Sequence, residues 1–267
     1  MNGPIKISPG WAVCLFLTLG IVGSECATAD DIICCGGEEV FVIDPSNPSV
    51  KQWTWRAENA PSIPKGFRAK FRSTDDCKPY RDDMLLITSS SGGVALVQRS
   101  TKKCVFLAES RNAHSAALLP NERVAVAASY GGDEMQFYDS ADCRKPAVPV
   151  QTIPLIGAHG AVWDKKRQCL WALGGDELLR LVANDQASAG KRWSIKSRHP
   201  LPSPGGHDLS PLHDGVRLFV TSNTQILLFD CDKMTFERHP EFGDQLKIKS
   251  VDLHPVTKAI VFHKASK

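Results

Sequence analysis

The chain has 267 residues, of which 42% are hydrophobic and 23% are charged, and its formal net charge is +3. These values are ordinary for a globular protein, and the length suits one large all-β domain or two smaller domains. The small net charge, without an extended basic segment, argues against a nucleic-acid-binding protein.

The first segment, residues 1–29, has the pattern of a secretory signal peptide. Lys6 precedes an apolar run from Trp11 to Val22, and Ala27-Thr28-Ala29 follows as an Ala-x-Ala cleavage site. The apolar run is too short to span a bilayer comfortably. We therefore expect residues 30–267 to be a single mature domain, secreted or periplasmic, with no transmembrane segment.

From residue 32 onward the chain repeats one pattern. Each copy opens on a polar residue and continues with a short apolar strand such as VAVAAS, CLWALG or RLFVTS, a tight turn and a second strand such as EMQFYD, ELLRLV or QILLFD. The opening positions are Asp75, His114, His159, His207 and Ser250, spaced by 39, 45, 48 and 43 residues. IICCGGEEVFVID, from Ile32, matches only the second half of a copy. Short strands repeated at this period predict a β-propeller with four strands per blade. We expect six blades with the last one incomplete, or five if the two ends merge.

Two further features of the copies fit this fold. A more polar segment follows each copy, as an exposed outer strand requires: VKQWTWRA, KCVFLAES, PVQTIPLI, KRWSIKS and TFERHPEF. Gly36-Gly37, Gly131-Gly132 and Gly174-Gly175 each fall between two strands, where glycine permits the positive φ of hairpin turns. The GGDEL stretch from Gly174 is therefore interpreted as a turn and not as a nucleotide-cyclase motif.

Seven cysteines remain in the expected mature chain, an odd number, so at least one stays free or pairs between chains. Their spacings contain no CxxC pair of the zinc-binding type. An oxidising compartment would permit disulfides, but the spacings leave the pairs unassigned.

The opening residues are the candidate functional site. In a propeller the first strand of each blade lines the central channel, so these residues should converge near one mouth. Asp75, His114, His159 and His207 would then form an arc that suits one divalent metal, Mn, Ni, Fe or Zn, and leaves coordination positions open. The alternative is that these histidines bind only water and neighbouring backbone.

Other polar residues near the openings complete the hypothesis. The expected ligand-binding residues are Asp76, Asn112, Ser115, Lys249 and Ser250. Asp208 and Lys78 are candidates either for supporting the ligating residues or for acid–base catalysis, although the chain contains no Ser-His-Asp order and no nucleophile elbow.

A set of short segments links the chain to a known family. DDCKP, NAHSAALLPN, AHGAVWD, LWALGGDEL, GHDLSP and IKSV resemble, in order and spacing, an uncharacterised family of secreted bacterial β-propeller proteins, from about Ile32 to Lys258. The resemblance implies the fold and export and carries no activity; it draws attention to Asp75, Asp76, His114, His159, His207 and Asp208. Members of that family continue with a Trp-Trp-containing segment, whereas this chain stops at Lys267. We therefore expect an incomplete final blade, partly closed by Ile32–Asp44 joining the strands from residue 247 onward.

The histidine arc is also similar, more loosely, to oligogalacturonate lyases, which are propellers that hold a metal mainly through histidines and cleave acidic sugars by β-elimination. The sequence thus predicts a monomeric, secreted β-propeller that binds a small-molecule or carbohydrate ligand at its channel mouth. Its enzymatic version would be a saccharide lyase or hydrolase. The alternative is a non-catalytic propeller that scaffolds other proteins on its broad face.

Overall fold

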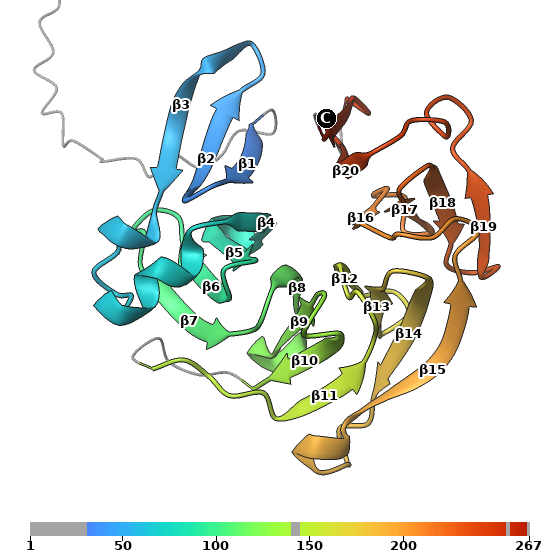
Figure 1. Ribbon diagram of the computed structural model, residues 1–267, viewed down its shortest axis with the longest axis horizontal. Helices are drawn as coiled ribbons and strands as arrows, with labels where there is room; N and C mark the ends of the chain where they lie inside the picture. Colours follow the sequence, from blue (N-terminus) through green and yellow to red (C-terminus); the bar gives the residue numbers. More distant parts are fainter. Residues whose placement is uncertain (1–30, 140–144, 255–256, 266–267) are drawn as a thin grey trace, which may run out of the picture.

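The computed structural model describes residues 31–139, 145–254 and 257–265. Short β-strands joined by tight turns form small antiparallel sheets arranged in a ring, with the first strands β4, β8, β12, β16 and β20 nearest the centre (Figure 1). The expected all-β propeller is confirmed. The predicted signal peptide, residues 1–29, lies outside the described residues.

Four sheets are complete blades, and in each the strands follow one another outward from the centre in chain order. The first two blades are β4 (Thr74–Tyr80), β5 (Met84–Ser89), β6 (Gly93–Gln98) and β7 (Cys104–Glu109), then β8 (Ala113–Leu118), β9 (Val124–Ala128), β10 (Glu134–Tyr138) and β11 (Gln151–Pro154). The next two are β12 (Gly160–Asp164), β13 (Cys169–Leu173), β14 (Glu177–Ala183) and β15 (Trp193–Pro200), then β16 (Asp208–Pro211), β17 (Arg217–Thr221), β18 (Ile226–Asp230) and β19 (Thr235–Arg238). The polar segments expected as outer strands form β3, β7, β11, β15 and β19.

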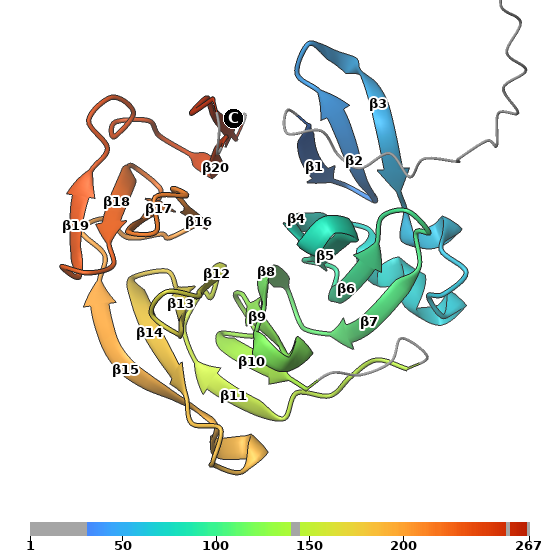
Figure 2. The same cartoon turned by 180° about the vertical axis from the view of Figure 1, so that it is seen from behind.

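Two smaller sheets flank the open side of the ring (Figures 1 and 2). One contains β1 (Ile32–Gly36), β2 (Glu39–Asp44) and β3 (Asn47–Trp55), and the other contains β20 (Ile248–Leu253) and β21 (Ile260–Lys264). In the described part of the chain no strand pairing connects these two sheets. The prediction that Ile32–Asp44 joins the strands from 247 onward is therefore wrong, because β1 pairs only with β2 and β20 only with β21. Five sheets of three or four strands make up the propeller, and the two-stranded sheet stands beside β16.

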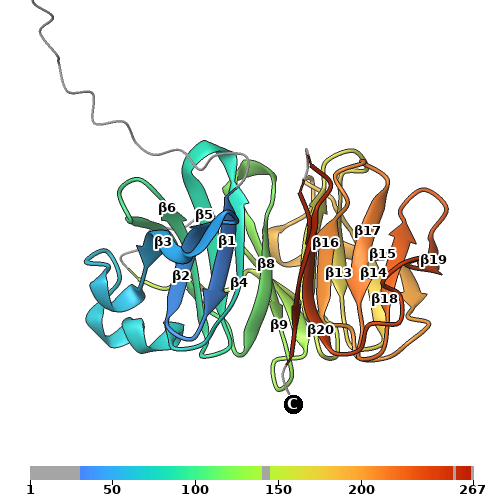
Figure 3. The same ribbon diagram turned by 90° about the horizontal axis from the view of Figure 1, so that it is seen from above.

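Side-on, the strands run roughly along the axis of the ring, so that turns gather at its two ends (Figure 3). Short 3-10 helices lie in the connections between strands: Ala57–Asn59, Lys65–Phe71, Arg81–Asp83, Pro120–Glu122 and Ala189–Lys191.

Apolar clusters between neighbouring blades form the core. Successive side chains of a strand point to opposite faces, so a strand buried on both faces serves two clusters at once. On β9, Val124 and Val126 pack towards the β4–β7 blade, whereas Ala125 and Ala127 pack towards the β12–β15 blade. Five such clusters join the six sheets in chain order. Each blade is therefore held mainly by its two neighbours.

The Gly174-Gly175 turn illustrates why glycine occurs between the strands. Gly131 has the expected positive φ of 85°, but Gly174 is required for a different reason. A Cβ on Gly174 would lie 2.5 Å from Leu155 Cδ1 and 2.9 Å from the Ile156 carbonyl oxygen. The expectation of a turn holds, and close packing of the preceding loop explains this glycine.

We expect Gly174→Ala to lower the free energy of unfolding by about 1–3 kcal/mol, because the added methyl group overpacks this contact. Gly175→Ala is the matched control, since its Cβ would meet nothing closer than 3.4 Å. Urea denaturation of both variants makes the comparison. Equal stability of the two would contradict the steric explanation.

Candidate ligand-binding site at the channel mouth

A local irregularity opens the innermost strands β4, β8 and β20. The β4–β5 register shifts between Thr74 and Asp76, so that Asp75 is the extra residue of a β-bulge. His114 on β8 and Lys249 on β20 are skipped in the same way. Bulges are frequent next to functional sites because they redirect a side chain.

The strands β12 and β16 show a related arrangement. The His159 N–H donates to the Leu173 carbonyl oxygen, although Leu173 pairs with Gly160, and the His207 N–H donates to Thr221, which pairs with Asp208. In both places, two consecutive residues of the inner strand lie opposite a single residue of the next strand, as in a β-bulge. In the β20–β21 sheet this position belongs to Lys249, one residue before the Ser250 that the repeat pattern indicated.

These five residues form a continuous arc at the mouth: Asp75, His114, His159, His207 and Lys249. Asp75 Oδ1 lies 3.8 Å from His114 Nδ1, and the rings of His114 and His159 have centroids 4.4 Å apart. The His159 and His207 ring centroids are 5.2 Å apart, and Lys249 Nζ lies 2.8 Å from His207 Nε2. The arc therefore runs from a carboxylate through three imidazoles to an ammonium group, across five consecutive sheets.

The three imidazoles are neutral at physiological pH. Burial lowers the pKa of His114, His159 and His207, each to about 4, and repulsion by Lys249 contributes to all three. Burial also lowers the pKa of Lys249, and nearby Lys247 adds to this effect. Burial raises the pKa of Asp75, whereas hydrogen bonds from Ser90 oppose the rise. A neutral imidazole presents one donor and one acceptor, so the arc offers both to a ligand.

Turn residues hold the imidazoles in place. His159 Nδ1 lies 2.8 Å from the Gly157 carbonyl oxygen and 3.1 Å from Ser129 Oγ. The residue is buried, with 6% of its surface exposed. His114 Nε2 lies 3.2 Å from Asn112 Oδ1. Contact of Asn112 with a ligand stays a prediction. His207 Nε2 lies 3.1 Å from Asn223 Oδ1.

Sequence reasoning missed the contributions of three turn residues: Ser129, Tyr130 and Asn223. They lie in the second turn of their blades, where their types vary from copy to copy. Tyr130 is 59% exposed, and its ring centroid is 5.6 Å from that of His159. The signal that could have found two of them is spacing, because Tyr130 follows His114 by 16 residues and Asn223 follows His207 by 16 residues.

The expected metal ligands come together without forming a metal-binding arrangement. Over residues 31–139, 145–254 and 257–265, no group of three or more His, Cys, Asp or Glu side chains is disposed to hold a metal ion. Asn112 contacts Nε2 of His114, and Asn223 and Lys249 contact Nε2 of His207. An ammonium group this close also repels a second cation. The divalent metal stays a prediction.

A second polar layer lies deeper in the channel, around Lys78. Its ammonium group donates to Ser115 Oγ at 2.8 Å, to the Ala116 carbonyl at 3.1 Å and to the Ala161 carbonyl at 2.7 Å. It also lies 3.1 Å from Asp76 Oδ2, which accepts a 2.7 Å hydrogen bond from Ser115. Lys78 on β4 therefore binds the inner strands β8 and β12. Asp76 and Ser115, expected to contact a ligand, are partners of this ammonium group.

The acidic groups in this layer stabilise the charged form of Lys78. Burial lowers the pKa of Lys78, but Asp76, Tyr80 and Asp208 more than offset it, and the pKa lies above its usual value. Burial raises the pKa of Asp208 to about 7, and repulsion by Asp76 adds to the rise. With its donors committed to acceptors, Lys78 is better suited to holding strands together than to transferring protons.

The structure also places the last two candidates. Asp208 Oδ2 accepts a 2.9 Å hydrogen bond from the Val251 N–H, which links β16 to β20. Ser250 is exposed and pairs with His263 on β21.

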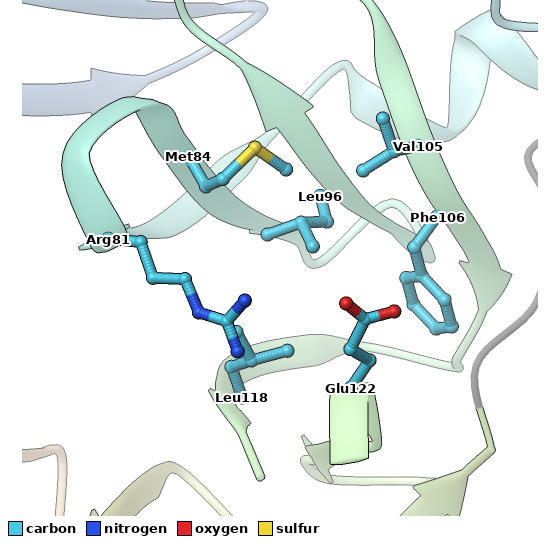
Figure 4. Close-up of a pocket in the computed structure, with 7 residues that line it drawn as sticks. All are labelled: Arg81, Met84, Leu96, Val105, Phe106, Leu118 and Glu122. Carbon is cyan, nitrogen blue, oxygen red and sulfur yellow. The ribbon is translucent and has the colours of Figure 1, made fainter. Parts of the chain in front are cut away.

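A separate cavity of about 290 Å³ lies at the other end of β4 and β8. It is lined by Arg81, Met84, Leu96, Val105, Phe106, Leu118 and Glu122 (Figure 4). Arg81 and Glu122 extend from opposite sides over an apolar floor. The cavity contains none of the predicted site residues, so it is distinct from the channel mouth.

Fold and mouth together define a β-propeller with a polar channel opening. The chain belongs to a family of unknown function, DUF6528, whose model matches residues 30–258. A comparison with curated proteins finds no match. Within the described residues, no helix has the length and apolar character needed to cross a membrane.

We expect Lys78→Met to lower the free energy of unfolding by about 3 kcal/mol, because it leaves Asp76 and Asp208 without their cation. Lys249→Met is the control, and this exposed lysine should change stability by about 1 kcal/mol or less. Urea denaturation at neutral pH measures both. Similar values for the two variants would contradict the bracing role of Lys78.

The low pKa values of the imidazoles predict a pH dependence. His159 takes up a proton in the unfolded chain below about pH 6.5 but in the folded protein only near pH 4. Its contribution is therefore complete above pH 6.5 and is lost as the pH falls towards 4. We expect the stability difference between the wild type and His159→Gln to shrink by about 1–2 kcal/mol from pH 7 to pH 5. A difference independent of pH would show that His159 is protonated alike in both states.

Proposed function

We propose that this propeller binds a small polar ligand, a carbohydrate or a similarly hydroxylated molecule, at its channel mouth. The observation that carries the proposal is the continuous arc from Asp75 to Lys249. Five side chains, each far from the next in sequence, come from the same position of successive sheets. Such a set presents convergent polar groups around one opening, which is the usual composition of a small-molecule site.

The chemistry of the arc favours a neutral or anionic ligand rich in hydroxyl groups. Neutral imidazoles both donate and accept hydrogen bonds, and so do sugar hydroxyls. The Lys249 ammonium group at one end attracts a carboxylate or another anionic substituent, and the Asp75 carboxylate at the other end accepts from hydroxyls. Opposite charges at the two ends would fix the orientation of a bound molecule.

The rim of the mouth adds an apolar surface. Tyr130 and Ile156 are 59% and 74% exposed, and both lie near Gly175. An exposed aromatic ring beside polar groups suits the apolar face of a sugar ring, since an aromatic side chain combines an apolar body with a polar tip. This rim favours a carbohydrate over a small inorganic anion.

We also propose that this site catalyses a reaction of its ligand. Asp208, with a pKa of about 7, has the protonation behaviour of a general acid or base near neutral pH. A saccharide lyase or hydrolase would use it below the arc, in a secreted or periplasmic protein. A divalent Mn, Ni, Fe or Zn ion held by Asp75, His114, His159 and His207 would require Lys249 to turn away from His207.

The alternative is a propeller that scaffolds other proteins, with the arc holding only water. Exposed edges such as β21, on which Val261 and Phe262 are 44% and 41% exposed, are compatible with it. The two functions differ in what they require of the arc, because a scaffold does not need its side chains.

The test is thermal unfolding of the purified protein with glucose, N-acetylglucosamine, glucuronate or galacturonate oligomers. We expect at least one probe to raise the melting temperature by about 2–4 °C at about ten times its Kd. His207→Gln and Lys249→Gln should abolish the shift. His213→Gln, in the β16–β17 turn, is the matched histidine control and should retain it.

If no probe raises the melting temperature of the wild-type protein, and both arc variants behave like the wild type, the result favours the scaffold. Elemental analysis of protein from metal-supplemented medium tests the metal in parallel. A bound metal lost in the double variant His114→Ala/His159→Ala would support the metal version of the site.

A further inference from the structure

We propose that Cys35 and Cys77 form an intramolecular disulfide that fixes the three-stranded β1–β3 sheet to the first complete blade. This modification site is independent of the arc and of any ligand. Cys35 lies on β1 and Cys77 on β4, and these strands belong to neighbouring sheets. The disulfide would therefore be a covalent connection between two blades.

Both cysteines lie against the apolar cluster between these sheets. Ile33 and Cys35 on β1 and Cys77 on β4 all pack against it. The start of β4 also lies directly beside the end of β1, because the Thr74 N–H donates a 2.7 Å hydrogen bond to the Gly37 carbonyl oxygen.

The neighbouring Cys34 lies on the opposite face of β1. Side chains alternate along a strand, so Cys35 shares the face of Ile33, and Cys34 points away from it. Cys34 is not a member of the interblade cluster. This alternation selects Cys35 as the partner of Cys77 and provides Cys34 as a built-in control.

The other described cysteines offer one competing pair. Cys104 donates a hydrogen bond to the Phe106 carbonyl oxygen. Cys169 and Cys231 share a buried cluster. A link between Cys169 and Cys231 is therefore a competing outcome of the test.

The reaction is thiol–disulfide exchange with a small disulfide such as oxidised glutathione. One protein thiolate attacks it, forms a mixed disulfide and releases one glutathione. The second thiolate attacks the protein sulfur of the mixed disulfide and releases another. Two protein thiols are oxidised, one glutathione disulfide is reduced to two thiols, and the two protons end on the glutathione molecules. A mildly alkaline buffer speeds the exchange, because the thiolate is the attacking form.

The consequence is stabilisation of the sheet at the open side of the ring. In the described structure, only one interblade cluster holds the β1–β3 sheet. A link from Cys35 to Cys77 closes a loop that contains β2, β3 and two 3-10 helices. Such a link restricts the unfolded chain more than the folded one.

The experiment oxidises the purified full chain with oxidised glutathione and compares it with protein kept in a phosphine reductant. We expect the loss of two alkylatable thiols per chain and a cross-linked peptide joining Cys35 to Cys77 in a non-reducing digest. The oxidised protein should melt about 5–10 °C higher than the reduced protein.

Cys34→Ser should behave like the wild type, whereas Cys35→Ser and Cys77→Ser should lose both the cross-link and the gain in melting temperature. If Cys77→Ser does not fold, Cys35→Ala provides the same test, because it removes the other thiol of the pair. The proposal is overturned if Cys35 and Cys77 remain alkylatable after oxidation, or if the mapped link joins Cys34 or Cys169 instead.

Discussion

Packing between neighbouring blades is the interaction on which the rest of this structure depends. The middle strands carry apolar side chains on both faces, and Leu170 and Trp171, one residue apart, belong to different clusters. A blade removed from its neighbours would expose both of these faces at once. The ring is therefore stabilised as a chain of nearest-neighbour contacts, as in other repeat architectures, and its two end sheets each have one described neighbour cluster.

The same repetition creates the channel mouth. A bulge or an equivalent two-against-one pairing opens every innermost strand from β4 to β20, and it turns one side chain per sheet towards the opening. The arc thus follows from a backbone irregularity that is repeated, with the side chain free to vary. This freedom allows a carboxylate, three imidazoles and an ammonium group to occupy equivalent places.

Much of this could be predicted from the sequence, because period and strand alternation are local properties. The propeller, the outer strands and the gathering of His114, His159 and His207 all follow from the repeat. The repeat placed the last opening position at Ser250 and not at Lys249, because a bulge shifts the register by one residue and leaves no trace in the apolar pattern. The reach of Lys78 to the Ala161 carbonyl depends on side-chain length and channel width, which a repeat does not encode. The prediction that Ile32–Asp44 closes the ring was wrong. A strand edge with free backbone groups can pair with any other edge, so the sequence of the strand does not determine its partner.

The position of the last arc residue depends on the buried layer beneath it. Lys249 belongs to the sheet with fewest strands, and that sheet is joined to β16 through the Val251 backbone. The Val251 N–H donates to Asp208, and its carbonyl oxygen accepts a 2.5 Å hydrogen bond from Ser210. Asp208 in turn lies in the field of Lys78, which holds β8 and β12. The deeper charges therefore position Lys249 at the mouth. A change at Asp208 or Lys78 would move Lys249 and so alter binding of the proposed ligand, even if neither side chain touches it.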